Sequence, residues 1–281
     1  MTSAIGVERQ GGVLTVTLSR PARRNAVDLA MQRELSALWD AVRNDTVRDD
    51  AAVRDDIAVR DDNVVRDDTV VRCIVVTGAG DAFCAGADLD DLAEMTGPSA
   101  GGRIEFCPAA TVAVPVIVAV NGLCVGAGLR FVADADIVLA AESAWFSDPH
   151  VSLGQLGLPV ALALAEKASA SSVAQLFLSG RRHRLSATAA HAAGIVSEVV
   201  ADGSLAERAA EVAAQVAAQS PAAVRLTVTA LRRRHRLALG GQMGEAWAQV
   251  ATQRGHPEAA EGLAAALERR APSWGSGGTM P

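Results

Sequence analysis

The segment PVIVAVNGLCVGAGLRFVADADIVLAAE, from Pro115 to Glu142, decides the fold of this chain. Its elbow of small residues, Gly126-Ala127-Gly128, opens a helix and so presents backbone N–H groups that attract negative charge. The elements predicted around the elbow are a strand at Val116–Val120, a turn at Asn121-Gly122, a helix at Leu129–Ala133 and a strand at Ile137–Ala140. Such an elbow is suited to stabilising an oxyanion.

The composition favours a globular protein of the α/β class. The chain has 281 residues, of which 50% are hydrophobic but only 3% are aromatic, and its formal net charge is −6. The negative charge and the scarcity of aromatic side chains argue against a nucleic-acid partner. No leader-like N-terminus and no apolar run of ~18 residues is present, so we expect a cytoplasmic location and no membrane partner.

The four cysteines are predicted to be small core residues. None belongs to a CxxC pair, and all lie in apolar or Gly/Ala surroundings. We therefore expect neither a metal site nor a disulfide. The cysteines are Cys73, Cys84, Cys107 and Cys124.

A tandem repeat interrupts the chain between Val47 and Val70. Four units of six residues, VRDDAA, VRDDIA, VRDDNV and VRDDTV, follow one another. Without them the sequence reads as a helix–loop–strand junction, so we interpret the repeat as an inserted loop, mobile or loosely helical. A cation-binding acidic array is the alternative, but the arginine in each unit argues against it.

Predicted strands and helices alternate as far as residue 200, and only helices follow. This predicts an α/β core at 1–200, a helical region at 201–270 broken at Ser220-Pro221 and Gly240-Gly241, and a disordered tail at 271–281. Other predicted elements are strands at Val13–Leu18, Cys73–Thr77 and Ile195–Val200, and helices at Asp28–Val42, Ala161–Ala170, Ser172–Ser179 and Ser186–Ala193.

Four ordered segments resemble the crotonase, or enoyl-CoA hydratase/isomerase, superfamily. They are RPARRNAVDLAMQREL (Arg20–Leu35), IVVTGAGDAFCAGADLDDL (Ile74–Leu92), the opening segment, and LSGRRHRLSATAAHAAGIVSEVV (Leu178–Val200). The resemblance implies a spiral of ββα repeats with a helical C-terminal trimerisation region. It also implies homotrimers or dimers of trimers, an acyl-CoA thioester substrate, and no cofactor beyond the coenzyme A that the substrate carries.

The resemblance also implies an oxyanion hole made of two backbone N–H groups, those of Ala85 and Ala127. The coenzyme A path would be lined by Arg24, Ala26, Ala85, Gly86, Ala87 and Asp88, with Arg24 near the phosphates. The family usually has glycine where this chain has Ala127. An alanine donates its N–H without strain only at negative φ, so we expect helical backbone there.

The chain departs from the family pattern at two catalytic positions. Where family hydratases use two glutamates to hold and activate water, this chain has Arg130 and His150. Arginine is not a base at neutral pH, but it binds carboxylates and phosphates. Histidine serves as acid or base. Asp148 either orients His150 or pairs with Arg130.

Two hypotheses for the function follow. In the first, the chain is an acyl-CoA enzyme in which His150, with Arg130 and Asp148, replaces the two glutamates. Hydration would then be weak or absent, whereas isomerisation, decarboxylation or C–C cleavage through an enolate remains open. In the second, the chain is a non-catalytic acyl-CoA-binding protein. The acyl pocket is expected around Met95–Phe106, and the sequence does not identify the acyl group.

Overall fold

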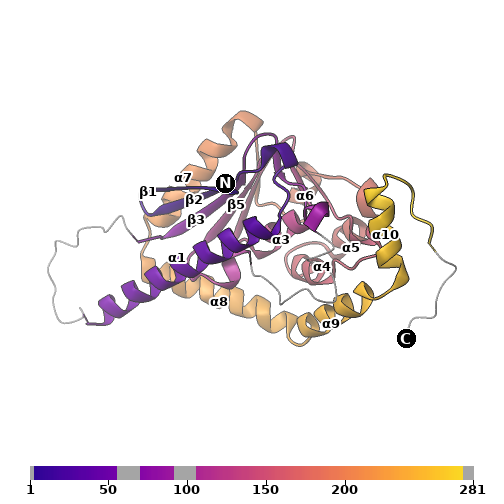
Figure 1. The fold of residues 1–281 in the computed structure, drawn as a ribbon. Helices are drawn as coiled ribbons and strands as arrows, with labels where there is room; N and C mark the ends of the chain where they lie inside the picture. Colours follow the sequence, from indigo (N-terminus) through magenta and orange to yellow (C-terminus); the bar gives the residue numbers. More distant parts are fainter. Residues whose placement is uncertain (1–2, 56–69, 92–105, 275–281) are drawn as a thin grey trace.

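A six-stranded sheet forms the centre of the molecule (Figure 1). The computed structural model describes residues 3–55, 70–91 and 106–274. The strand order is β1-β2-β3-β5-β7-β10; β1 and β2 are antiparallel and the other neighbours are parallel. The strands are β1 (Ile5–Gln10), β2 (Val13–Leu18), β3 (Cys73–Gly78), β5 (Val116–Val120), β7 (Ile137–Ala141) and β10 (Glu198–Val200).

A second sheet of short strands gives the chain its spiral course. Its order is β4-β6-β8-β9, and each of its first three strands follows a strand of the main sheet along the chain. The strands are β4 (Ala82–Cys84), β6 (Leu123–Val125), β8 (Trp145–Ser147) and β9 (Leu185–Ser186). The pairs β3–β4, β5–β6 and β7–β8 thus form successive turns, and the latter two lead into helices. This is the predicted spiral.

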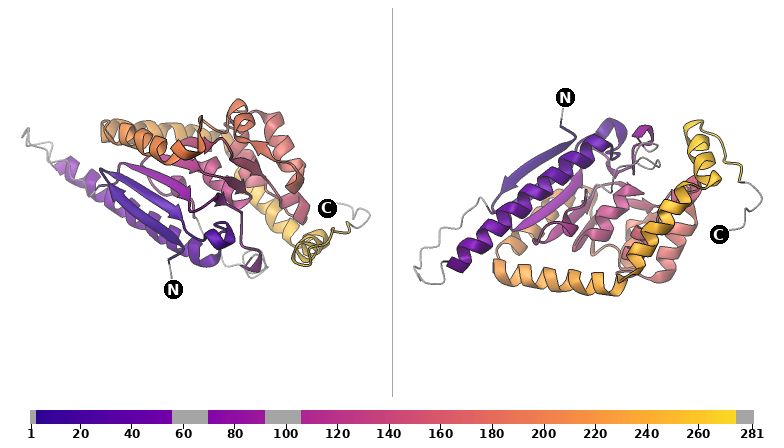
Figure 2. Two further views of the ribbon diagram at one scale, coloured as in Figure 1. Left: turned by 90° about the horizontal axis from the view of Figure 1, so that it is seen from above. Right: turned by 60° about the horizontal axis from the view of Figure 1, so that its bottom comes forward.

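Helices cover both faces of the main sheet. Figure 2 shows the sheet between α1 (Leu29–Asp55) and α7 (Leu205–Ala217). The remaining helices are α3 (Ala127–Asp134), α4 (Leu158–Ala165), α5 (Ala170–Leu178), α6 (Ala187–Ala192), α8 (Pro221–Leu239), α9 (Gln242–Arg254) and α10 (Pro257–Leu267). No helix in the described ranges is long and apolar enough to cross a bilayer.

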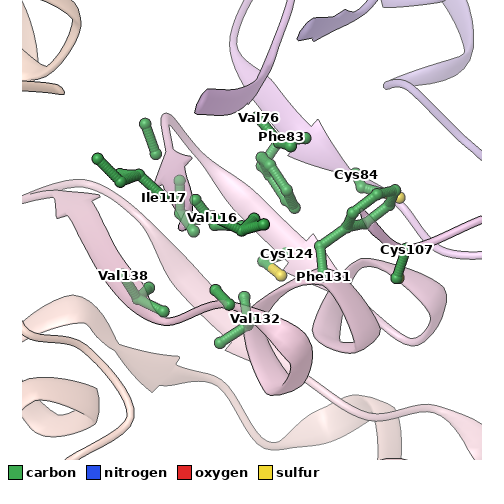
Figure 3. Packing of buried hydrophobic residues seen from close by; sticks show 14 of the residues in the cluster. Val76, Phe83, Cys84, Cys107, Val116, Ile117, Cys124, Phe131, Val132 and Val138 are labelled. Carbon is green, nitrogen blue, oxygen red and sulfur yellow. The ribbon is translucent and has the colours of Figure 1, made fainter. Parts of the chain in front are cut away.

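The core continues from the main sheet to the buried face of α3 (Figure 3). The Phe131 ring of α3 packs edge-on against Phe83 at 5.9 Å and Phe106 at 5.3 Å between centroids. Cys84 and Cys124 lie opposite one another in β4 and β6. Burial raises the pKa of the Cys84 thiol to about 12. All four cysteines are buried, which confirms their predicted place in the core.

The helix predicted at Asp28–Val42 is longer than expected. The Asp28 side chain accepts from the Met31 N–H at 2.7 Å and so caps the helix, as predicted. However, α1 continues to Asp55 and includes the whole first repeat unit. The repeat was interpreted as an inserted loop, mobile or loosely helical, and residues 47–55 of it are helical because α1 propagates through them. Residues 56–69 lie outside the described part.

Hydrogen bonds from the Arg232 side chain join α8 to the core. Its guanidinium binds the Asp136 carboxylate at 2.5 and 2.9 Å. It also donates to the carbonyl oxygens of Ala109, Val112 and Val114. Asp136 in turn accepts from the Val116 N–H at 2.8 Å. The helical C-terminal region is thus tied to the start of β5, the strand that leads to the elbow.

Candidate active site

The elbow presents the N-terminus of α3. Gly126 has φ 51° and ψ −108°, a conformation that suits glycine, and its N–H donates to Ser147 O at 3.2 Å. The helix begins at Ala127, and no side chain caps it. The positive φ thus falls on Gly126, and Ala127 is helical as expected. The first N–H groups of a helix lack intrahelical acceptors, so that of Ala127 is suited to bind an incoming oxygen.

A loop from Ala85 to Asp88 lies against the elbow. Gly86 has φ 103°, and a Cβ built there would lie 3.2 Å from Val125 O and 3.8 Å from Ala127 N. No residue larger than glycine fits this approach without strain. The loop and the elbow therefore bring the predicted donor segments together.

The Ala85 N–H is already in use, which corrects the choice of donor. It donates to the Arg24 carbonyl oxygen at 2.9 Å. Farther along the loop, Val27 N donates to Gly86 O at 2.8 Å and Asp88 N donates to Val27 O at 2.9 Å. Because successive N–H groups of an extended segment point in opposite directions, the Ala87 N–H faces away from Val27. Ala87 is the better donor candidate.

An arginine that was not predicted as a site residue braces this loop. Arg20 binds Asp28 at 3.1 Å and Asp88 at 2.9 Å, and it donates to Ala26 O at 2.6 Å. Asp88 is buried, so its charge is compensated within the protein. Arg20 thereby joins the two segments that were expected to line the coenzyme A path. Arg24, which was expected near the phosphates, is exposed.

Asn25 is a second structural residue that the sequence reading missed. It is fully buried and adopts a left-handed conformation with φ 55°. Its Nδ2 donates to Ala79 O at 2.9 Å and Ala82 O at 2.7 Å, while its Oδ1 accepts from Arg20 N at 2.9 Å. The sequence did carry an indication of this role, because asparagine tolerates the left-handed conformation better than most residues.

His150 and Asp148 form a hydrogen-bonded pair on the other side of the elbow. The His150 Nδ1 lies 2.8 Å from Asp148 Oδ2, and the His150 N–H donates to Asp148 Oδ1 at 3.1 Å. Asp148 is fully buried, whereas the His150 side chain is 27% exposed. A carboxylate only accepts hydrogen bonds, so the proton resides on Nδ1 and Nε2 can act as a base. Of the two predicted arrangements, the structure shows the one in which Asp148 orients His150.

Three contacts hold the His150 loop in place. A Cβ built at Gly126 would lie 3.4 Å from Pro149 Cδ, so the loop packs directly on the elbow. From the other side, Gln253 Nε2 donates to Gly154 O at 2.9 Å. Gly262 of α10 lies so close to Leu153 that any side chain would clash. Helices α9 and α10 thus pack against the loop and hold its position.

Arg130 lies one turn into α3, between two aromatic rings. Its guanidinium carbon is 5.3 Å from the centroid of Phe106 and 5.9 Å from that of Trp247 in α9. The residue is partly buried. The acyl pocket was predicted around Met95–Phe106, and of that segment only Phe106 lies within the described residues.

Comparisons with known proteins extend over nearly the whole chain. A model of the enoyl-CoA hydratase/isomerase family matches residues 62–277. A mevalonyl-coenzyme A hydratase of Aspergillus fumigatus is 31% identical, with 93% of this chain and 91% of the relative covered. A 2,3-dehydroadipyl-CoA hydratase of Escherichia coli is 29% identical, with 97% and 98% covered. The crystal structure of an enoyl-CoA hydratase/isomerase from Pseudoalteromonas atlantica has a TM-score of 0.79 at 27% identity, covering 97% of this chain and 100% of that one.

Proposed function

Since this chain belongs to the enoyl-CoA hydratase/isomerase (crotonase) family, we propose that it is an acyl-CoA enzyme in which His150 moves a proton at the acyl group. The observation that carries this proposal is the pairing of His150 with the buried Asp148. It fixes the tautomer in which Nε2 accepts a proton, and it stabilises the imidazolium that then forms.

The thioester oxygen would be held by the N–H groups of Ala127 and Ala87. Both belong to segments that meet at Gly86, and neither requires a particular side chain. Removal of a proton next to the thioester places negative charge on this oxygen, which two fixed donors stabilise. Ala26, Gly86 and Ala87 would line the coenzyme A path, and Arg24 would approach its phosphates. Asp88 would act by holding this loop against Arg20.

We expect classical hydration to be weak. Syn hydration needs two groups that hold water and exchange protons with it, and here one of the two family positions carries Arg130. An arginine stays protonated at neutral pH, so His150 is left as a single acid–base residue. The site is suited to a reaction that one base completes through an enolate, such as shifting a double bond, and we propose isomerisation rather than hydration.

The assembly would be a homotrimer or a dimer of trimers. Helix α8 exposes Leu226, Leu231 and Leu237 by 72%, 61% and 70%. Single exposed leucines are common, but three on one helix favour a covered surface. The native mass in solution tests this assembly.

A screen of acyl-CoA thioesters tests the catalytic proposal. Wild-type protein is incubated with saturated, 2-enoyl and 3-enoyl thioesters, and the products are identified by chromatography and mass spectrometry. We expect turnover that His150→Ala removes and that His191→Ala retains, because His191 lies on α6 and bonds to Val196 O. Binding without any product from wild-type protein would instead favour the acyl-CoA-binding alternative. Fast hydration of crotonyl-CoA, near ~10³ s⁻¹, would contradict the proposed role of a single base.

A further inference from the structure

The imidazole of His150 lies against a residue that has no side chain. Gly157 directly precedes α4, and a Cβ built on it would lie 3.0 Å from His150 Nδ1. The same Cβ would lie 3.0 and 3.1 Å from two ring atoms of Phe177 in α5. Since atoms in favourable contact lie about 3.5–4.0 Å apart, a side chain at position 157 would have to displace one of the two rings.

The restriction at position 157 is steric and does not come from the backbone. Gly157 has φ −90° and ψ 21°, a conformation that residues with a side chain also adopt. In this it differs from Gly126 and Gly154, whose φ values are positive. The space that the two rings occupy is therefore what excludes a larger residue.

Of the two rings, the imidazole is the one that a side chain at position 157 would move. Phe177 is only 7% exposed, and α4 packs against α3, α5 and α9 (Figure 1). Gly157 O also accepts from the Ala161 N–H at 3.0 Å, which holds the start of α4 in place. The His150 side chain is 27% exposed, so it can turn towards solvent.

Such a movement would act on the nitrogen that bonds to Asp148. The atom 3.0 Å from the built Cβ is Nδ1, which also lies 2.8 Å from Asp148 Oδ2. Asp148 is fully buried, and its Oδ1 accepts from the His150 backbone N–H, so the carboxylate would not follow the ring. Without the bond to Asp148, the proton is no longer confined to Nδ1.

We propose that Gly157 is a positioning residue for His150: because it has no side chain, the imidazole can rest on Asp148 with its proton on Nδ1 and with Nε2 available as the base. This inference rests on the proposed function, in which His150 moves a proton at the acyl group. A purely structural role, in which glycine only lets α4 pack against Phe177, predicts that the state of the imidazole does not depend on residue 157.

The tautomer of His150 tests the inference without a substrate. Nitrogen-15 NMR distinguishes a protonated ring nitrogen from an unprotonated one, and His150→Ala identifies the His150 signals among those of the five histidines. In mildly alkaline buffer, where histidine is neutral, we expect the proton on Nδ1 in wild-type protein and a mixture of tautomers in Gly157→Ala. The signals of His191, whose Nδ1 bonds to Val196 O, should not change.

Turnover should follow the tautomer. With a thioester that the wild-type protein converts, Gly157→Ala should lower kcat roughly 10- to 100-fold, because the base is displaced. KM should change only a few-fold, since the thioester would be held by other residues. The matched control is Gly203→Ala, because a Cβ built at Gly203 has no described atom within 4 Å. It should leave both kcat and the imidazole signals as they are in wild-type protein.

Thermal unfolding tests the contact itself. Gly157→Ala should lower Tm by about 2–6 °C in otherwise wild-type protein. In the His150→Ala background the decrease should be smaller, because the Cβ then occupies space that the imidazole has left. If Gly157→Ala folds only in that background, the contact is supported as well. Equal decreases in both backgrounds, or failure to fold in both, would assign the clash to Phe177 and overturn the inference.

The outcomes separate the inference from the proposed function. If Gly157→Ala leaves the tautomer and kcat as in wild-type protein, the inference is overturned and the proposed function stands. If wild-type His150 carries its proton on Nε2, both are overturned. If wild-type protein converts no acyl-CoA, the proposed function is overturned, and the NMR comparison still decides whether Gly157 positions the imidazole.

Discussion

In one half of the proposed site the acting groups would be backbone N–H groups, and in the other half they would be side chains. The donor half comprises residues 24–28, the Ala85–Asp88 loop and the start of α3, and Arg20 and Asn25 join the first of these segments to residues 79–88. The acid–base half comprises Arg130, Asp148 and His150. An amino-acid substitution replaces a side chain, but it leaves a backbone N–H group in place unless the new residue is proline. The donor half can therefore be retained while the reaction changes in the other half.

Asp148→Asn breaks the acid–base half and should have the largest effect. An asparagine can donate to Nδ1 and so favour the tautomer in which Nε2 carries the proton and is no longer a base. We expect turnover to fall by about 10²–10⁴-fold, with acyl-CoA affinity changed only a few-fold. Steady-state kinetics and calorimetry on the same preparation measure both quantities. A parallel loss of binding would show that the two halves do not act separately.

Asn25→Ala breaks the donor half. It removes three hydrogen bonds made by a fully buried side chain and places alanine in the left-handed region, so the free energy of unfolding should fall by about 2–4 kcal/mol. Asn25→Gly is the matched control, because it loses the same hydrogen bonds but keeps the backbone conformation at little cost; it should be about 1 kcal/mol more stable than Asn25→Ala. Urea unfolding measures both. Equal stability of the two variants would contradict the role assigned to the backbone.

Glu261→Gln removes a contact on α10, which covers the acid–base half, and should have the smallest effect. Two hydrogen bonds from Arg270 and one from the Ser273 N–H lower the pKa of Glu261 to about 2. The wild-type carboxylate therefore stabilises the fold fully above pH ~4.5 and loses this contribution as the pH falls towards 2. Because the pair is exposed, we expect a decrease in Tm of at most about 2 °C at pH 7.

The pH dependence provides the control for this variant. The difference in stability between wild-type protein and Glu261→Gln should shrink as the pH falls from about 4.5 to 2. Turnover at pH 7 should be unchanged, since the contact of α10 with the His150 loop is made by Gly262 and not by Glu261. A large loss of turnover would instead couple the end of the chain to the acid–base half.

Long elements could be read from the sequence, whereas short strands and site geometry could not. The strand at Val116–Val120 and the helix breaks at Ser220-Pro221 and Gly240-Gly241 were predicted where the structure has them. The strands β4, β6 and β8 have three residues each, too few to show an alternating pattern. β1 was missed because it is an edge strand with mostly exposed side chains.

The choice between Ala85 and Ala87 as N–H donor shows what could not be predicted from the sequence within the site. The sequence places Ala85 and Ala87 in one motif of small residues, and nothing in their side chains distinguishes them. The distinction depends on a hydrogen bond to Arg24, 61 positions before Ala85 in the chain. By contrast, the pairing of Asp148 with His150 was one of the two arrangements expected from the sequence, because only one residue separates them.

The close contact of Gly262 with Leu153 has a consequence for the order of biosynthesis. The donor half uses residues up to Ala127, so its own segments are synthesised before the His150 loop. The His150 loop is held by Gln253 and Gly262, which are translated about a hundred residues later. A nascent chain should therefore form the segments of the proposed oxyanion hole before its His150 loop is held in place, and become competent for the proposed chemistry only after residues 253–262 have been synthesised.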